Sequence, residues 1–217
     1  AVQAMPIGFI RQAEHFYLAG VLSLVPGDNL FVDHQGRWLG EYVPSVFRGH
    51  PFKLAKMEEQ DKLVLCVDED SGLISDTTGE PFFDENSQLA PPVLEVRNFL
   101  EKVAQNSAAT QQAVNALAMA GVLVPWPVRI DAGDEAHTPA GLYRVDEAGL
   151  SRLDDTTFLK LRTALALPVA YAQLFSMAKM GMLKKLAEFR KRQQPQPPGE
   201  VDLEKLFGPE DDILRFS

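Results

Sequence analysis

The longest regular pattern in the sequence runs from Val93 to Ala120, where apolar residues recur at the spacing of a helix face. Those residues are Leu94, Phe99, Leu100, Val103, Val114 and Leu117. Asn106-Ser107 favours an interruption in the middle, and Gly121 is a typical stop signal. We therefore expect a long helix here, followed by an extended segment over 122–130.

A second helical stretch is expected from about Thr156 to Arg192. Asp154 or Asp155 would provide its N-cap, and Pro168 and Gly181 would kink or divide it. Its last turns carry positive charge, which suits a helix C-terminus: Lys184, Lys185, Arg190, Lys191 and Arg192.

The first part of the chain has the shorter pattern of strands and turns. Segments 8–10 and 17–22 are expected to be strands. Segments 30–32 and 37–43 flank a turn in which Gly36 would adopt a positive φ, which predicts a hairpin.

Further strands are expected at 52–55, 63–67 and 141–145. The last of these would pair antiparallel with the extended segment 122–130. The run from Leu63 to Val67 is continuously apolar, which predicts a central strand covered on both faces. Cys66 in this run and Trp38 in the predicted hairpin are expected to belong to the core. The resulting fold class is α+β, a mostly antiparallel sheet with two long helices packed on one side.

Three parts of the chain are expected to differ in organisation. Residues 1–192 have the length and apolar content of a single α+β domain. Residues 193–199 form a linker rich in proline and glutamine, and residues 200–217 form an acidic amphipathic tail. The tail contains apolar residues that a purely disordered segment would rarely have: Leu203, Leu206, Phe207, Ile213, Leu214 and Phe216. We therefore expect the tail to dock on its own domain or on a partner.

The acidic balance of the chain argues against nucleic acid as a partner. Its formal net charge is −9, which repels phosphate backbones. The longest apolar stretch, 163–178, is shorter than the roughly 20 residues that a membrane span requires, so no transmembrane span is expected. The N-terminus lacks the pattern of a secretory signal, which by itself predicts a cytoplasmic location.

Motifs for catalysis, cofactors and metals are not recognisable. The sequence has no Walker loop, no dinucleotide fingerprint and no serine elbow. The acidic stretch 68–84 superficially resembles a calcium loop, but glycines stand where two of the oxygen ligands would be needed. We therefore expect neither a metal nor a cofactor, and the catalytic residues, if the chain is an enzyme, are unknown.

Aromatic residues are concentrated in one stretch and form the candidate ligand or partner surface: Phe31, Trp38, Tyr42, Phe47 and Phe52. Aromatic faces bind apolar parts of peptides and sugars, and they also pack in cores. Core packing, a peptide or carbohydrate groove and a surface for a partner protein all remain open at this point.

Four segments in order resemble the SapC family of bacterial proteins, which is named for a surface-layer association. They begin with Pro26-Gly27-Asp28-Asn29-Leu30-Phe31-Val32-Asp33 and continue through Gly36-Arg37-Trp38 to Tyr42-Val43-Pro44. The others are 48–54 with 63–69, Gly79-Glu80-Pro81-Phe82-Phe83-Asp84, and Gly141-Leu142-Tyr143-Arg144-Val145-Asp146-Glu147. The resemblance extends over about residues 6–188 and brings no established catalytic residues.

This resemblance implies a non-catalytic interaction or accessory protein, linked to surface-layer or protein-processing assembly. Its partner would be another protein or a second copy of the chain, and the family name implies a place at the cell surface. Two alternatives stay open: an enzyme whose active-site residues are dispersed in the sequence, and a peptide- or carbohydrate-binding module that uses the aromatic stretch 31–52.

Overall fold

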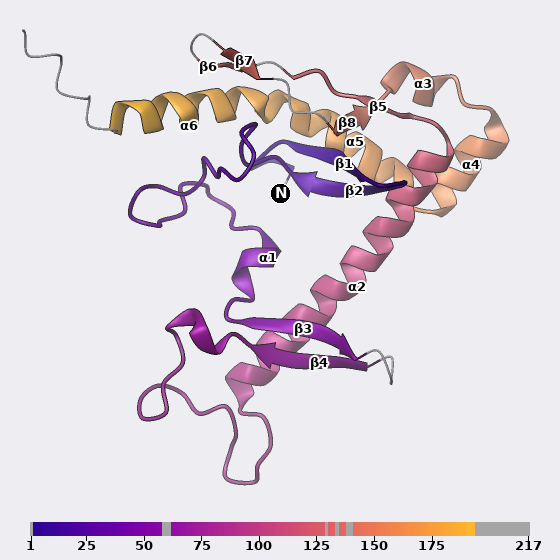
Figure 1. The fold of residues 1–217 in the computed structure, drawn as a ribbon. Helices are drawn as coiled ribbons and strands as arrows, with labels where there is room; N and C mark the ends of the chain where they lie inside the picture. The colour runs from indigo at the N-terminus through magenta and orange to yellow at the C-terminus, as the bar shows by residue number, and fades with distance from the viewer. Residues whose placement is uncertain (1, 58–61, 129, 133–134, 138–140, 194–217) are drawn as a thin grey trace, which may run out of the picture.

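The computed structural model describes residues 2–57, 62–128, 130–132, 135–137 and 141–193. Apart from Gln193, the predicted linker and the predicted tail lie outside the described residues. The α+β class is confirmed, because antiparallel sheets and helices together make up the fold (Figure 1).

A four-stranded antiparallel sheet in the order β2-β1-β8-β5 is the centre of the molecule. Its strands are β1 (Ile7–Gln12), β2 (His15–Gly20), β5 (Leu123–Pro125) and β8 (Leu142–Val145). The predicted strands near the N-terminus are confirmed, and so is the antiparallel pairing of 141–145 with the segment after Gly121. A small hairpin, β6 (Ile130–Ala132) and β7 (Glu135–His137), lies between β5 and β8 in the sequence.

Apolar clusters cover both faces of this sheet. On one face, Phe9 and Val145 pack with residues of α2 (Pro91–Met119), α4 (Asp155–Thr163) and α5 (Ala166–Ser176). On the other, Leu142 packs with the loop after β2 and with Leu183 of α6 (Met180–Gln193). The expectation of two long helices on one side is thus only roughly met, since α6 belongs to the second cluster.

Two fully buried polar side chains of α5 connect this helix to the sheet. The Gln173 side-chain oxygen accepts a hydrogen bond from the Val145 N–H at 2.9 Å, and the Ser176 hydroxyl oxygen accepts one from the Ile7 N–H at 3.0 Å. Buried backbone N–H groups need such partners, so these two bonds fix where α5 lies against the sheet.

The helices follow the predicted pattern, with one exception. Helix α2 continues through Asn106 and Ser107, so the expected interruption was wrong. Both side chains are exposed, where Asn and Ser cost a helix only a few tenths of a kcal/mol, about 0.5 each. Packing of α2 at both ends outweighs that cost.

The second helical stretch is divided, as predicted. Asp154 caps α4 by accepting a hydrogen bond from the Thr157 N–H at 3.0 Å. The chain then turns at Leu165, whose φ is 54°, so that Pro168 falls in the first turn of α5, where a missing N–H costs nothing. A 3₁₀ turn, Met177–Lys179, separates α5 from α6, and a short helix α3 (Glu147–Ser151) precedes α4.

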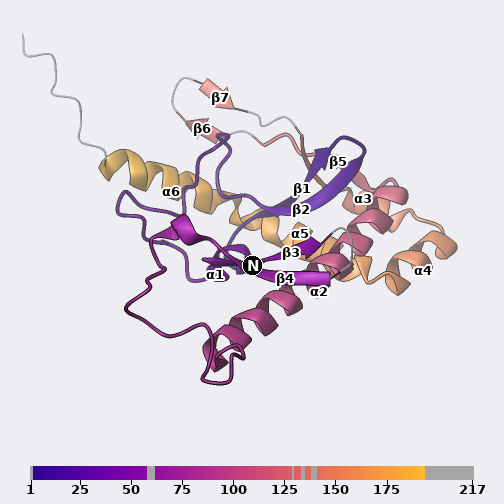
Figure 2. The same ribbon diagram turned by 60° about the horizontal axis from the view of Figure 1, so that its bottom comes forward.

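A smaller lobe, which we call the hairpin lobe, lies at the N-terminal end of α2 (Figures 1 and 2). It contains α1 (Ser45–Arg48), the antiparallel pair β3 (Phe52–Met57) and β4 (Lys62–Val67), and a 3₁₀ turn, Glu69–Ser71. Strand β3 packs against α2, which runs from this lobe to the main sheet.

The expectation that Leu63–Val67 forms a central strand was wrong. It pairs with β3 alone, and one face of this two-stranded sheet is open: Val64 is 39% exposed and Cys66 is also exposed. An apolar run predicts burial of both faces only when other elements cover them, and here it is β3 that packs against α2. Cys66 is therefore not a core residue.

The predicted hairpin over 30–43 was right in its turn and wrong in its strands. Gly36 has a φ of 78°, and Asp33 closes the turn by accepting hydrogen bonds from the Gln35 and Arg37 N–H groups at 2.9 Å. The flanks share a single bridge, Val32 with Trp38, and are otherwise irregular.

Candidate functional site

Three of the predicted aromatic residues form a continuous cluster between the main sheet and the hairpin lobe. Phe31 is buried, and its ring stacks on Trp38 with centroids 5.3 Å apart and planes at 18°. The Trp38 ring in turn contacts the ring of Phe47 on α1, with centroids 5.7 Å apart. The rings thus form a series from the core to the surface, because Phe31 is 1% exposed and Phe47 is 44% exposed.

Backbone contacts hold the middle of this series in place. The Trp38 indole N–H donates to the Tyr42 carbonyl oxygen at 3.1 Å, and the Leu39 N–H donates to the Phe31 carbonyl oxygen at 2.7 Å. Gly40 has no room for a side chain, because a Cβ there would come within 2.8 Å of the Trp38 indole nitrogen. The half-buried indole is therefore fixed in one orientation.

Arg48 connects this cluster to α2. Its guanidinium carbon lies 5.5 Å from the Tyr42 ring centroid and 5.0 Å from the Phe99 ring centroid. Cation–π contacts of this kind contribute about 0.5–1 kcal/mol each at exposed sites. Beside Arg48, Gly49 approaches α2 so closely that a Cβ would meet Leu100 at 2.6 Å. Helix α1 is thus fixed against α2.

Apolar side chains next to the aromatic cluster are open to solvent. Val46 is 75% exposed and Phe47 is 44% exposed, and Leu39 beside Trp38 is 39% exposed. We call these three residues and the rim residue Arg48 the junction surface. Neighbouring apolar residues exposed on a fixed base are typical of surfaces that bind a partner.

Phe52, the fifth predicted residue, does not join this group. It lies on β3 and contacts Phe82 of the following loop, with ring centroids 5.6 Å apart. The structure therefore brings together Phe31, Trp38 and Phe47, places Tyr42 beside them through Arg48, and separates Phe52. Phe31 belongs to the core, so among the predicted aromatic residues Phe47 is the most accessible.

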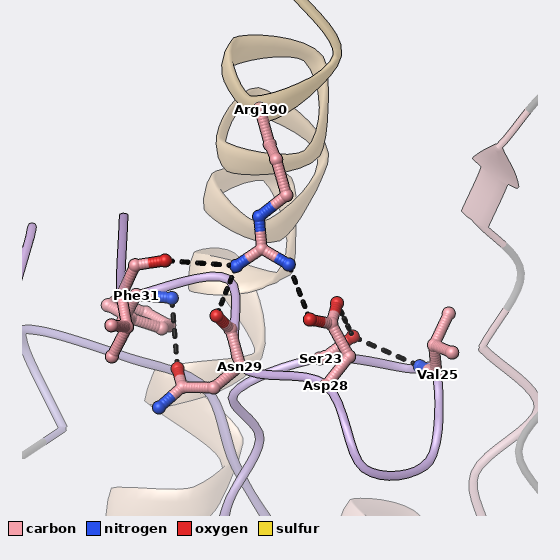
Figure 3. A network of polar contacts seen from close by, with 7 residues as sticks. Ser23, Val25, Asp28, Asn29, Phe31 and Arg190 are labelled. Carbon is pink, nitrogen blue, oxygen red and sulfur yellow. Dashed lines mark hydrogen bonds and ion pairs between the residues drawn. The ribbon is translucent and has the colours of Figure 1, made fainter. Parts of the chain in front are cut away.

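A polar network fixes the loop that leads into the cluster (Figure 3). Arg190 of α6 forms an ion pair with Asp28 and donates hydrogen bonds to the Asn29 and Val32 carbonyl oxygens, the latter at 3.1 Å. The Asn29 side-chain oxygen accepts from the Phe31 N–H at 3.0 Å. The end of α6 thereby positions the backbone around Phe31.

The same network sets the ionisation of Asp28. Partial burial raises the pKa of its carboxyl, but hydrogen bonds from Arg190 and Ser23, together with the charge of Arg190, outweigh this effect. The pKa is left below its usual value, so the carboxylate stays ionised. Asp33 in the neighbouring turn also has a lowered pKa, chiefly through the Arg37 backbone N–H.

Sequence reasoning missed several residues of this site. Arg48 and Phe99 are separated in the sequence and meet through the packing of α1 on α2. Arg190 was recognised as part of a basic helix end, but its ion pair with Asp28 joins residues 162 positions apart. Neither pair has a local spacing that could reveal it.

The described residues contain neither a metal-binding group nor a membrane-spanning helix. Within the described ranges, no group of three or more His, Cys, Asp or Glu side chains is placed so that it could hold a metal ion. Among the helices described, none combines the length and apolarity needed to cross a membrane.

Comparison with known proteins gives one family. The family model described as SapC matches residues 1–183, which include the aromatic cluster and the hairpin lobe. The match ends within α6, so Arg190 lies beyond it. Neither the curated proteins nor the solved structures contain a match to the chain.

Proposed function

Because this chain belongs to the SapC family, we propose that it is a non-catalytic interaction protein that binds another protein through the junction surface. The observation that carries this proposal is the exposure of Val46 and Phe47 on a base fixed by Trp38 and Arg48. Aromatic residues held rigidly at a surface supply contact area at low entropic cost.

The chemistry of the surface indicates what the partner presents. Val46 and Phe47 need an apolar segment, and Arg48 at the rim offers a positive charge to an acidic group. We therefore propose an apolar peptide segment flanked by a carboxylate. Participation in surface-layer or protein-processing assembly, at the cell surface or in the cytoplasm, is the wider part of the same proposal.

A carbohydrate-binding role is less well supported. Sugars bind to open aromatic faces, and the Trp38 indole is half-buried with Phe31 stacked on it. The ring of Phe47 is smaller than an indole, and its plane is tilted by 49° to the plane of the Trp38 ring. The accessible apolar surface fits a side chain inserted by a partner protein better than a flat sugar ring.

Site-specific photo-crosslinking in cells of the source organism tests the proposal. A photoreactive amino acid replaces Val46 in one variant and Met119, which is 90% exposed at the end of α2, in a control variant. We expect a covalent protein adduct from position 46 that disappears when Phe47→Ser is added. Identical adducts from both positions, or none from position 46, would overturn the proposal.

A further inference from the structure

A second apolar surface lies on the outer side of α5 and α6. Tyr171 and Phe175 are 42% and 73% exposed, and their rings stack with centroids 6.3 Å apart. Phe189 on α6 is 45% exposed. Tyr171, Phe175 and the exposed Ala178 follow one another at intervals of four and three residues, and the exposed Lys185 and Phe189 follow at intervals of seven and four. We call these five residues the outer stripe.

This stripe is an exception on helices that otherwise bury their apolar residues. In α5 the buried side consists of Ala166, Ala170 and Gln173, and in α6 it includes Leu183. Phe175 lies opposite the buried side of α5. Because Phe175 is 73% exposed, it gains only a small part of the stabilisation that full burial would give, at about 25 cal/mol per Å² of buried apolar area.

Positive charge accompanies the stripe on α6. Lys185 and Arg192 stand four residues before and three residues after Phe189, on its side of α6, and the exposed Lys184 and Lys191 add positive charge to the same helix. Glu188 is the single acidic residue between Met180 and Gln193. A segment that covers this end of the stripe therefore needs to be both apolar and acidic.

Residues 200–217, which lie outside the described residues, have that composition. The segment contains six acidic residues and two basic ones, and its apolar residues include Leu203, Leu206 and Phe207. We propose that this segment of the same chain docks on the outer stripe, with its apolar side chains on Phe175 and Phe189 and its carboxylates towards the basic residues of α6. The inference is independent of the junction surface.

Chain length permits this contact. The segment from Gln193 to Leu206 can extend to about 43 Å at 3.3 Å per residue. The helical path from Gln193 back to Phe175 is about 27 Å at 1.5 Å per residue. Leu203 can extend to about 33 Å from Gln193, so both Leu203 and Leu206 can reach Phe175 and Phe189.

A short tether also favours the same chain over a second copy. A tether of this length gives an effective concentration in the millimolar range, far above a micromolar concentration of separate chains. Docking within the chain therefore prevails at low protein concentration. Exchange between two chains would instead depend on dilution.

Hydrogen exchange of the full chain, followed by mass spectrometry, tests this proposal. We expect amides of 203–216 to exchange at least about tenfold more slowly than in a free peptide of the same sequence, at every protein concentration. The double variant Phe175→Ser/Phe189→Ser should remove this protection. Leu159→Ser, at a position on α4 that is 51% exposed and outside the stripe, should leave it unchanged.

Charge reversal gives an independent readout. The double variant Lys185→Glu/Arg192→Glu keeps the aromatic residues and should also accelerate exchange in 203–216. Exchange as fast as in the free peptide would overturn the proposal, as would protection that survives both double variants. Protection that disappears on dilution would overturn it in favour of a contact between two copies.

Discussion

Arg190 and Asp28, 162 residues apart in the sequence, form an ion pair that fixes the end of α6 to the loop entering the aromatic cluster. Arg190 also donates to two backbone carbonyl oxygens of that loop. One guanidinium thus satisfies three acceptors on a segment without regular structure. This contact adds to the packing of Phe31 with Leu142 and Leu183, which already joins the loop to the main sheet.

Replacing Arg190 by Met should lower the free energy of unfolding by about 1–2 kcal/mol, because charged hydrogen bonds are lost while the apolar stem is kept. The loss should lie near the lower end of the range known for hydrogen bonds to charged groups, because the side chains of Arg190 and Asp28 are both about one-third exposed. Urea denaturation measures the change. Arg162→Met is the control, because Arg162 is exposed on α4 and lies outside both proposed surfaces. Equal losses in both variants would contradict the assignment.

The stabilisation by Asp28 should depend on pH. The folded-state pKa is lowered, so the carboxylate contributes stability above its unfolded pKa of about 4 and loses that contribution as the pH falls through the folded value. The difference in unfolding free energy between the wild type and Asp28→Asn should therefore be constant near neutral pH and shrink in acid. A difference that persists unchanged below about pH 3 would contradict this explanation.

Gln173→Leu should destabilise the protein by about 1–3 kcal/mol, because the buried Val145 N–H loses its acceptor. The leucine side chain is similar in size, so packing changes little. Thermal or chemical denaturation gives the value, and Gln112→Leu on the exposed side of α2 provides the control. A neutral effect of Gln173→Leu would mean that the Val145 N–H finds another partner.

Cys66 should react in the native protein. Its side chain is exposed on the open face of the β3–β4 hairpin. A chromogenic disulfide reagent should therefore modify the native thiol at a rate within about tenfold of that in urea, since access does not require global unfolding. A native rate that is slower by several orders of magnitude would place Cys66 in a covered position.

The sequence predicted those elements whose signals are local. The strands near the N-terminus, the cap at Asp154 and the turn at Gly36 each depend on residues within a few positions of one another. The division of the second helical stretch was predictable for the same reason, because Pro168 acts on the turn that precedes it.

Features that depend on neighbours distant in the sequence were not predictable. The apolar run Leu63–Val67 does not reveal that β4 pairs with β3 alone and is open on one side. The aromatic stretch made Phe31, Trp38 and Phe47 candidates for one surface, but it did not reveal that their rings contact one another or that Phe52 contacts Phe82 instead. Burial of Phe31 and exposure of Phe47 follow from tertiary packing, which residue type does not determine.

The most direct test of the junction surface is the affinity of a protein crosslinked from position 46 for the wild-type chain and for Phe47→Ala, measured by calorimetry. Phe47 is 44% exposed, so its replacement should change the free energy of unfolding by less than about 1.5 kcal/mol. An aromatic anchor in an interface is worth about 2 kcal/mol or more, so the dissociation constant should rise by at least about thirtyfold. An unchanged dissociation constant, with the fold intact, would contradict the account.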